Sequence, residues 1–389
     1  MRVLITTDSF TPTVNGVVTS IMNLRRELTK RGHEVRVLTL SQTPHSYYES
    51  GVTYIGSVSA EKVYPGARFR SAPARKLVRD IVEWEPEIIH SQNEFSTFII
   101  AHRMARKLGI PIVHTYHTVY EDYTHYFSPS QHLGQRMASD FSRWIIGKTS
   151  CVIVPTDKMR LLLRDYGVPG DIHVIPTGIE LGKFMKPANP ENIVLLKQSH
   201  GIPASNLVLV FVGRLAKEKN VDELISYFSS LQRNDMTLLL VGDGPAKADL
   251  ERQTEQLCLN GNVIFSGMVA QESIADYYHL GDLFVNASSS EAQGLTYIEA
   301  LSSGLPALCR KDPCLDGVVI DGINGWQYNN QQEFTAYLNI FADDMQLRQS
   351  MHANTTQYVG KYSSETFAEA VENVYSNLLK QDIEPVPTL

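Results

Sequence analysis

Long apolar runs are missing from this chain of 389 residues, although 43% of its residues are hydrophobic. No uninterrupted apolar stretch approaches the roughly 20 residues that a membrane-spanning helix needs. The first apolar run, residues 3–5, is too short for a secretory signal peptide and is soon followed by Asp8. The sequence therefore predicts a cytoplasmic globular protein that is long enough for two domains with substantial cores.

Cysteine pairs and metal-binding patterns are also sparse. The four cysteines, Cys151, Cys258, Cys309 and Cys314, are scattered and have no metal-type pairing with histidine. Buried or incidental thiols are expected, rather than disulfides or zinc ligands. No Asp-x-Asp pair follows a predicted strand, so the sequence predicts neither a required metal nor a cofactor.

The dinucleotide fingerprint G-x-G-x-x-G is absent as well. Residues 2–7 nevertheless form a β-branched run, followed by a loop containing Gly16, a helical pattern that ends at Gly32, and a second strand at 35–40. This order is typical of a Rossmann-like half, in which ligands bind at the carboxyl ends of the strands. No acidic residue ends the second strand, which disfavours a dinucleotide redox fold. Gly16 would let the backbone approach a ligand closely.

Strands and helices continue to alternate along the chain, which predicts an α/β fold with mostly parallel sheets. In the first half, strands are expected at 87–90, 110–115, 151–154 and 172–175, and helices at 94–108, 131–147 and 156–166. Residues 176–206 interrupt this pattern and are interpreted as a hinge.

A second Rossmann-like half follows the interruption. Its strands are expected at 207–213, 237–241, 262–265, 282–285, 306–309 and 317–320, and its helices at 220–232, 245–257 and 271–279. Helices near 332–341, 344–358 and 364–380 finish the chain. We therefore expect an N-terminal domain at 1–180, a C-terminal domain at 181–360, and a final helix and tail at 361–389, for which a return to the first domain is one possible arrangement.

Charge is distributed unevenly along the chain. The net charge is −7, yet residues 1–185 hold 22 basic and 17 acidic residues, whereas the remaining 204 hold 13 and 25. Within residues 61–80, six basic residues face only two acidic ones. This segment predicts a basic loop that leads into an amphipathic helix, which can lie on an anionic membrane surface or form a solvated face. The candidate membrane contacts are Arg68, Arg70, Arg75, Lys76 and Arg79.

The stretch at 288–306 carries the first candidate site. Glu291 and Glu299 bracket a Gly-Leu-Thr sequence that opens a helix, and a helix N-terminus can bind phosphate through its free N–H groups. Carboxylates beside such a site would suit sugar hydroxyls better than phosphate. The alternative interpretation is a capping acid and an ordinary surface glutamate.

Two further motifs follow strand ends. Residues 213–220 place Arg214 and Lys219 five apart before a helix, so that both cations could bind one diphosphate, although an ordinary surface turn is the alternative. His117 follows the strand at 110–115 and could hydrogen-bond a sugar hydroxyl. Beside it lies a polar aromatic cluster suited to contacting an acceptor, which includes Tyr120, Tyr123 and His125.

Together these motifs resemble glycosyltransferase family 4, the large family of retaining, two-Rossmann-domain (GT-B) nucleotide-sugar glycosyltransferases. The resemblance covers nearly the whole chain and rests on residues 11–20, 115–118, 175–179 and 213–220 and on the E-x7-E pair. Residues 16–20 and 117–123 are most similar to those of bacterial diacylglycerol α-glucosyltransferases. The resemblance implies two Rossmann-like domains whose parallel sheets face each other across a cleft.

The resemblance also implies a role for each motif. Arg214 and Lys219 would bind the donor diphosphate, Glu291 the hydroxyls of the donor sugar, and Glu299 the ribose. His117 would bind the donor sugar or the reacting oxygens, and the backbone at 267–269 would contact the edge of the base. The further donor contacts are Gly16, Val17, Met268, Val269, Gly294, Leu295 and Thr296. Ala292 and the polar segment 308–312 depart from the usual family pattern.

The implied reaction is retaining transfer of a hexose, expected to be glucose, from a UDP-sugar to diacylglycerol at the inner face of the cell membrane. A same-face, ion-pair-like displacement is expected, because no carboxylate is obviously placed as a nucleophile; Glu291 is the alternative nucleophile. A soluble sugar, a polysaccharide or phosphatidylinositol as acceptor, an epimerase, and a non-catalytic binder remain alternatives. Partners are the donor, the lipid and an anionic membrane, without nucleic acid. The sequence predicts no oligomeric state.

Overall fold

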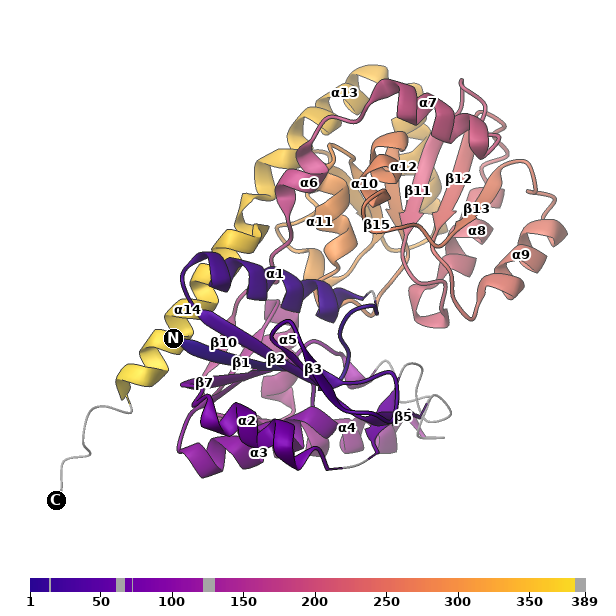
Figure 1. Ribbon diagram of the computed structural model, residues 1–389. Coiled ribbons are helices and arrows are strands. Elements are labelled where there is room, and N and C mark those ends of the chain that lie inside the picture. Colours follow the sequence, from indigo (N-terminus) through magenta and orange to yellow (C-terminus); the bar gives the residue numbers. More distant parts are fainter. Residues whose placement is uncertain (14, 61–66, 72, 122–129, 382–389) are drawn as a thin grey trace. The chain divides into compact units, whose positions relative to one another are not determined.

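The computed structural model describes residues 1–13, 15–60, 67–71, 73–121 and 130–381. It divides into two compact units, Met1–Gly178 with Ser364–Leu389 (unit 1) and Ile179–Ser363 (unit 2) (Figure 1). The chain thus leaves unit 1 at Gly178 and returns to it at Ser364. No helix in the part of the chain that the structure describes has the length and apolarity to cross a membrane.

Unit 1 is built on an eight-stranded sheet with the order β10-β9-β8-β7-β1-β2-β4-β3. Its strands are β1 (Arg2–Thr6), β2 (Glu34–Leu40), β3 (Tyr47–Glu49), β4 (Val52–Ile55), β7 (Ile88–Ser91), β8 (Ile112–Thr115), β9 (Cys151–Val154) and β10 (Ile172–Val174). All neighbours are parallel except β3 and β4. A separate antiparallel pair joins β5 (Ser57–Ser59) to β6 (Arg68–Arg70).

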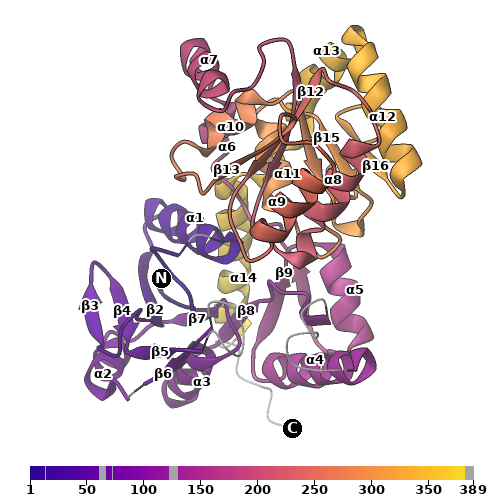
Figure 2. The same cartoon turned by 90° about the vertical axis from the view of Figure 1, so that its right-hand side faces the viewer.

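Successive side chains of β1 enter different cores, as the two-residue period of a strand requires. Val3 and Ile5 pack with α1 (Gly16–Lys30) and α14 (Ser364–Gln381), whereas Leu4 packs with α2 (Arg75–Glu83) and α3 (Ser96–Leu108). Figures 1 and 2 show α4 (Gln131–Ile146) on the same side of the sheet as α2 and α3. The helix α5 (Asp157–Asp165) lies beside β9 and β10. The sheet is therefore covered on both faces, which explains its continuous apolar strands.

Unit 2 has a six-stranded, fully parallel sheet with the order β13-β12-β11-β14-β15-β16. Its strands are β11 (Leu207–Val212), β12 (Met236–Val241), β13 (Val263–Gly267), β14 (Leu283–Asn286), β15 (Ala307–Arg310) and β16 (Gly325–Tyr328). Its helices are α6 (Leu181–Met185), α7 (Pro190–Ser199), α8 (Val221–Ser229), α9 (Lys247–Gln256), α10 (Ile274–Leu280), α11 (Leu295–Ser302), α12 (Gln331–Asp343) and α13 (Met345–Asn354). Alternate residues of β11 pack into the two cores on opposite faces.

One strand prediction in this region is wrong. Residues 317–320 do not form a strand; the strand that pairs with β15 is β16. A Cβ on Gly325 would lie 2.0 Å from the carbonyl oxygen of Ala307, so the close strand pairing requires a glycine that weakens the sequence pattern. The chain passes from unit 1 to unit 2 within the expected hinge at 176–206, and this segment also contains α6 and α7, which were not predicted. Asn189 caps α7 by accepting a hydrogen bond from the Glu191 N–H, and Pro190 occupies its first turn.

Candidate functional site

The first candidate site lies in unit 2 at the carboxyl ends of β11 and β14. The chain order reverses between these neighbouring strands, since β12 and β13 lie on one side of β11 and β14 to β16 on the other. Ligands of open parallel sheets bind at such a switch point, where two loops diverge. Here Asn220 donates a hydrogen bond to the Ala287 carbonyl (3.2 Å), and Ser290 donates one to the Glu218 carbonyl (3.2 Å). The two loops are therefore fixed against each other.

Lys219 and Glu291 join these loops by an ion pair. The Lys219 Nζ lies 2.5 Å from the Glu291 Oε1, and the two side chains are 20% and 15% exposed. Arg214 is ion-paired with Glu218, whose side chain is nearly buried. The four charges balance one another. A diphosphate that bound here would have to compete with the carboxylates for both cations.

Glycine backbones allow the strand-end loops of this site to approach closely. A Cβ on Gly242 would lie 1.9 Å from the Gly213 carbonyl oxygen, and one on Gly244 would lie 2.3 Å from the Leu215 carbonyl oxygen. Gly294, at the start of α11, has a φ of +74°, and its Cβ would lie 2.4 Å from the Tyr297 ring. Larger residues would displace the loop that carries Glu291.

Glu299 lies on α11, eight residues after Glu291, and is held by Tyr278. The Tyr278 hydroxyl donates a 2.7 Å hydrogen bond to the Glu299 Oε2. Burial raises the pKa of Glu299, while the hydrogen bond from Tyr278 and the charge of Lys183 act in the opposite direction. This fixed carboxylate can accept hydrogen bonds from ligand hydroxyls.

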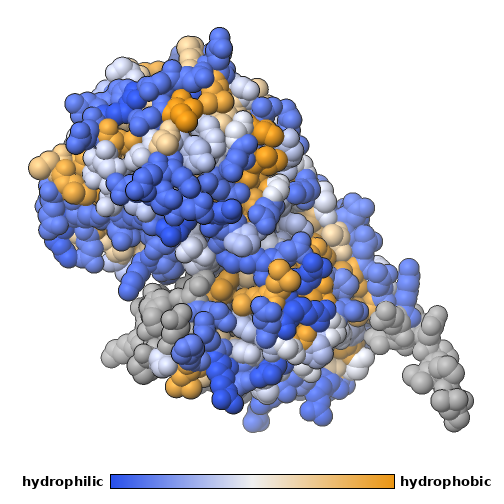
Figure 3. Space-filling view, turned by 180° about the vertical axis from the view of Figure 1, so that it is seen from behind, coloured by the Kyte–Doolittle hydropathy of each residue, from blue (hydrophilic) through white to orange (hydrophobic). Residues whose placement is uncertain are grey.

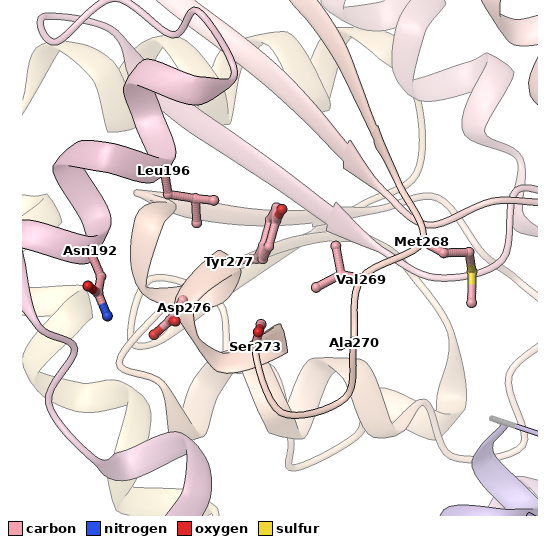
Figure 4. Close-up of a pocket in the computed structure, with 8 residues that line it drawn as sticks. All are labelled: Asn192, Leu196, Met268, Val269, Ala270, Ser273, Asp276 and Tyr277. Carbon is pink, nitrogen blue, oxygen red and sulfur yellow. The ribbon is translucent and has the colours of Figure 1, made fainter. Parts of the chain in front are cut away.

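A cavity of about 350 Å³ is lined in part by Met268, Val269 and Ala270, which directly follow β13. In Figure 4, Asn192 and Leu196 of α7 lie on one side and Val269 on the other, with Tyr277 between them. Met268 extends away from these residues and is 70% exposed. The segment expected to contact the base is thus accessible within unit 2.

Unit 1 has a corresponding switch point between β1 and β7, because β2 lies on one side of β1 and β7 on the other. The Asn93 Oδ1 accepts hydrogen bonds from the Thr7 hydroxyl (2.8 Å) and the Asp8 N–H (3.0 Å). The Asp8 Oδ1 accepts one from the Thr97 N–H (2.8 Å). The Asp8 Oδ2 is buried without a hydrogen-bond partner among the described residues, and burial raises the pKa of Asp8 to about 6.

His117 follows β8 and is oriented by Gln92. Its Nε2 lies 2.7 Å from the Gln92 Oε1, so His117 donates this hydrogen bond and carries its proton on Nε2. Burial, together with the neighbouring His114, lowers the pKa of His117 to about 3. His117 is therefore neutral at physiological pH, and its Nδ1 is the acceptor of the ring.

Glu94 connects two of the aromatic residues near His117. Its Oε2 accepts a 2.6 Å hydrogen bond from the Tyr120 hydroxyl, and its Oε1 lies 3.3 Å from the His114 Nε2. Glu94 and His114 are buried, with side-chain exposures of 2% and 0%. Burial and the Glu94 charge raise the pKa of Tyr120 well above its usual value. Tyr120 therefore remains a hydrogen-bond donor at any working pH.

Comparisons with known proteins assign the chain to a family. The model described as Glycosyltransferase Family 4 matches residues 14–183, and the model described as Glycosyl transferases group 1 matches residues 193–358. An alpha-monoglucosyldiacylglycerol synthase of Streptococcus pneumoniae is 34% identical over 98% of this chain and 89% of its own length. One of Acholeplasma laidlawii is 31% identical over 98% of both chains.

The chain belongs to glycosyltransferase family 4. Its fold is that of solved structures of low sequence identity. The chain superimposes on the Anabaena HepE protein in complex with UDP and glucose with a TM-score of 0.76, at 19% identity over 97% of this chain and all of that one. For the sucrose-phosphate synthase of Thermosynechococcus elongatus the TM-score is 0.78, at 20% identity over 98% and 99% of the chains. The prediction of a GT-B fold with two parallel α/β domains is confirmed.

The structure of this glycosyltransferase brings several predicted donor-binding residues together. Lys219 contacts Glu291, and Glu291, Gly294, Leu295, Thr296 and Glu299 lie along one loop and helix. Arg214 lies on the same loop as Lys219, whereas Met268 and Val269 follow a different strand of unit 2. Gly16 and Val17 begin α1 in unit 1, where Asn15 caps the helix by accepting a hydrogen bond from the Val18 N–H.

The predicted acceptor and membrane residues of the glycosyltransferase differ in their placement. Arg68 donates to the carbonyl oxygens of Ser41 (3.1 Å) and Gln42 (2.8 Å), so it contributes to the local fold. Side chains on β6 and α2 that are exposed include Arg70, Arg75, Lys76 and Arg79. Tyr123 and His125 lie outside the described residues, whereas Tyr120 contacts Glu94.

Sequence reasoning missed the residues that support His117 and Tyr120, namely Asp8, Gln92, Glu94 and His114. The sequence contains a pattern that could have revealed them: residues 90–94 are five consecutive polar or ionisable residues that follow an apolar run at a strand end. Among the described residues, no group of His, Cys, Asp or Glu side chains is arranged to hold a metal ion.

Proposed function

We propose that this glycosyltransferase transfers glucose from UDP-glucose to the hydroxyl of diacylglycerol with retention, giving an α-monoglucosyl-diacylglycerol. The similarity to two alpha-monoglucosyldiacylglycerol synthases across 98% of the chain carries this proposal. Relatives of lower identity, 25% and 29%, are GDP-mannose-dependent alpha-mannosyltransferases. The test must therefore vary both the nucleotide base and the sugar of the donor.

On the donor side, Lys219 and Arg214 exchange their carboxylate partners for the diphosphate. The N-terminal N–H groups of α11 add partial positive charge, as helix N-termini do. Glu291, released from Lys219, then accepts hydrogen bonds from sugar hydroxyls, and Glu299 accepts them from the ribose. The ion pairs of the free protein thus keep both cations in place before the donor arrives.

The proposed chemical step needs no protein nucleophile. The bond between the sugar C1 and the diphosphate oxygen breaks, and the acceptor oxygen bonds to C1 on the same face. The acceptor proton passes to an oxygen of the departing phosphate, whose charge Lys219 and Arg214 stabilise. Neutral His117 contributes a hydrogen bond to the donor sugar or the reacting oxygens, and its orientation is fixed by Gln92. No metal or other cofactor takes part.

On the acceptor side, we place the lipid hydroxyl near His117, Asp8 and Tyr120 of unit 1. Exposed cations on β6 and α2 support binding to an anionic membrane surface, since each nearby basic residue contributes about 1 kcal/mol. The enzyme would then act as a peripheral protein on the inner face of the cell membrane. No nucleic acid is a partner in this reaction.

The test uses labelled UDP-glucose, UDP-galactose, UDP-N-acetylglucosamine and GDP-mannose, each with diacylglycerol in detergent micelles. We expect the label of UDP-glucose to enter the lipid phase, the anomeric proton of the product to show the α configuration, and EDTA to leave the rate unchanged. Label that enters only water-soluble glycosides, or an altered UDP-sugar without a glycoside, would refute the lipid acceptor. Loss of activity in EDTA would refute the metal-free mechanism.

A further inference from the structure

Two helices of unit 1, α3 and α4, lie side by side on the same side of the sheet as α2 (Figures 1 and 2). The rings of Phe95, which caps α3, and Phe141 of α4 stack with centroids 5.6 Å apart. Farther along α3, His102 lies close to Lys148, which follows α4: burial, and then the charges of Lys148 and Arg106, lower the pKa of His102. Both contacts thus pair an earlier residue of α3 with an earlier residue of the α4 segment, and a later one with a later one. The helices therefore run in the same direction. Because each packs inward, its exposed side chains form the outer surface of the layer.

Large apolar side chains occupy this outer surface. On α4, Leu133, Met137 and Trp144 are 53%, 47% and 52% exposed, and their spacing of four and seven residues places them along one stripe. Beside them, Phe95 and Ile99 are 48% and 43% exposed. A helix that covers a sheet ordinarily presents polar residues to solvent. Figure 3 shows apolar side chains at the surface of unit 1 from behind. Such patches mark interaction sites.

The same two helices carry an excess of basic residues. Between them, residues 95–108 and 131–148 carry Arg103, Arg106, Lys107, Arg136, Arg143 and Lys148 against a single acid, Asp140. The Asp140 carboxylate is ion-paired with Arg143. This excess of five positive charges stands in a chain with a net charge of −7. The Lys148 Nζ also lies 4.7 Å from the centroid of the Trp144 ring, an arrangement that joins the apolar stripe to the cations.

We propose that this α3–α4 face is a membrane-contact surface, distinct from the basic segment at 61–80, that inserts Leu133, Met137 and Trp144 into the headgroup region of an anionic bilayer. The arginines and lysines of the two helices bind lipid phosphates, as on interfacial amphipathic helices, and tryptophan is enriched at this depth. Pairing of two copies through this face is disfavoured, because it would bring like-charged sets of cations together.

The proposal extends the lipid acceptor of the proposed function. Exposed cations of α2, on the same side of the sheet, would continue the charged surface of the α3–α4 face. Membrane contact would then spread over a three-helix layer rather than a single segment. The apolar stripe supplies affinity that salt does not screen, whereas the cations supply the preference for anionic lipid.

Tryptophan fluorescence tests the contact directly. The chain has three tryptophans, and Trp84 and Trp326 are only 9% and 7% exposed, so Trp144 dominates the solvent-sensitive emission. With vesicles of phosphatidylglycerol and phosphatidylcholine, we expect a blue shift and quenching by lipids brominated on their acyl chains. Trp144→Phe should abolish both signals. Unchanged, unquenched Trp144 emission in protein that sediments with the vesicles would overturn the proposal.

Variants separate the apolar and the charged contributions. Leu133→Ser with Met137→Ser should weaken vesicle partitioning about tenfold. In the wild type, the exposed part of each side chain, roughly half of it, leaves water when the protein binds the vesicle, and the serine variant loses this contribution. The matched control is Val194→Ser with Leu195→Ser on α7, which removes exposed apolar surface (54% and 62%) from unit 2 and should leave partitioning unchanged. Replacing Arg103, Arg106 and Lys107 by Gln should reduce the preference for anionic over neutral vesicles by more than tenfold.

Two measurements distinguish failure of this inference from failure of the proposed function. Transfer to diacylglycerol in detergent micelles should be unaffected in the Leu133→Ser, Met137→Ser variant. If the wild-type enzyme itself shows no transfer to diacylglycerol, only the proposed acceptor is refuted. If the variant partitions onto vesicles like the wild type, the α3–α4 face is not a membrane contact. A change in its oligomeric mass without a change in partitioning would instead identify the face as a contact between two copies.

Discussion

In the proposed mechanism, the ion pair between Lys219 and Glu291 is formed in the free enzyme and broken when the donor binds. In the free enzyme it satisfies two partly buried charges. In the proposed donor complex Lys219 turns to phosphate and Glu291 to the sugar, so the ion pair holds both groups ready without leaving an unpaired charge. Each of the two residues therefore depends on the other for its position.

Replacing Lys219 by Met should lower kcat/KM for the donor about 100- to 1000-fold, because the departing diphosphate loses a fixed cation. Lys217→Met is the matched control: this exposed lysine lies two residues away on the same turn, and its loss should change kcat/KM less than threefold. Steady-state kinetics with UDP-glucose provides the measurement. Equal losses in the two variants would show that only general charge matters.

Asp8 should make the stability of the enzyme depend on pH. Burial raises its pKa from 3.8 to about 6, so the folded protein keeps a proton that the unfolded chain releases between these values. The free energy of unfolding should fall by up to about 3 kcal/mol as the pH rises through this window. Asp8→Asn has no proton to release. It should therefore be more stable than the wild type at pH 7.5, and equally stable near pH 4.

Urea unfolding of both proteins at several pH values measures this difference. Asp80→Asn, which changes an exposed carboxylate on α2, is the control and should leave the pH profile of stability unaltered. A constant difference between Asp8→Asn and the wild type from pH 4 to pH 8 would contradict the prediction. A transfer assay of Asp8→Asn would report whether the carboxylate of Asp8 is needed for the reaction.

At the scale of elements, the loop that enters α11 depends on Gly294. Its φ of +74° and the nearby Tyr297 ring both oppose a side chain there. Gly294→Ala should lower the free energy of unfolding by about 2–3 kcal/mol and reduce donor affinity, because Glu291 moves with the loop. Gly304 has a similar φ of +79° but no atom within 4 Å of its would-be Cβ.

Gly304→Ala thus isolates the backbone strain, and we expect it to cost about 1 kcal/mol. Thermal and urea unfolding of the two variants give the comparison. If both lose the same stability and retain the same KM for the donor, the contact with Tyr297 has no influence on the site. A larger loss for Gly294→Ala would show that the loop cannot adjust.

Elements with strong local patterns were predictable from the sequence. The apolar run of β11 and the Gly304 stop after α11 lie where they were expected. β16 was not, because Gly325 and Gln327 break the apolar pattern of a strand only four residues long. α7 was missed because its exposed Val194 and Leu195 give it little amphipathic character.

The candidate site divides in the same way. Glu291, Lys219 and His117 belong to motifs that are contiguous in sequence, so they could be selected as candidates without any geometry. Asp8 and Glu94 lie 86 positions apart and meet only because β1 and β7 are neighbours in the sheet. Strand order is set by tertiary packing and cannot be obtained from local patterns.

At the scale of the whole molecule, α14 completes unit 1 from the far end of the chain. Tyr375 is buried against β1, and its hydroxyl lies 2.6 Å from the His90 Nδ1, while the His90 Nε2 lies 2.6 Å from the Thr115 hydroxyl. Both ring nitrogens of a buried histidine are therefore satisfied. Thr115 lies two residues before His117, so this contact supports the strand that carries the site.

Tyr375→Phe should lower the free energy of unfolding of unit 1 by about 1–2 kcal/mol, because the His90 Nδ1 is left buried without a partner. Amide hydrogen exchange, measured separately over β7, β8 and α14, should be faster in the variant than in the wild type, and this increase should be larger there than in unit 2. Tyr48→Phe, at an exposed position of β3, is the control and should have no effect. Unchanged exchange in Tyr375→Phe would show that α14 is held by its apolar contacts alone.

The position of α14 also sets an order for biosynthesis. The first 178 residues are synthesised before Ile179–Ser363, yet the apolar side chains of α1 and β1 that pack against α14 are covered only once Ser364–Gln381 has been made. At 5–20 residues per second, translation of the intervening segment takes roughly 10–40 s. During that interval the nascent first unit exposes the apolar side chains that later cover Phe367, Val371 and Tyr375. Its native packing is thus reached only after α14 has been translated, and chaperones have a defined surface and time window in which to bind it.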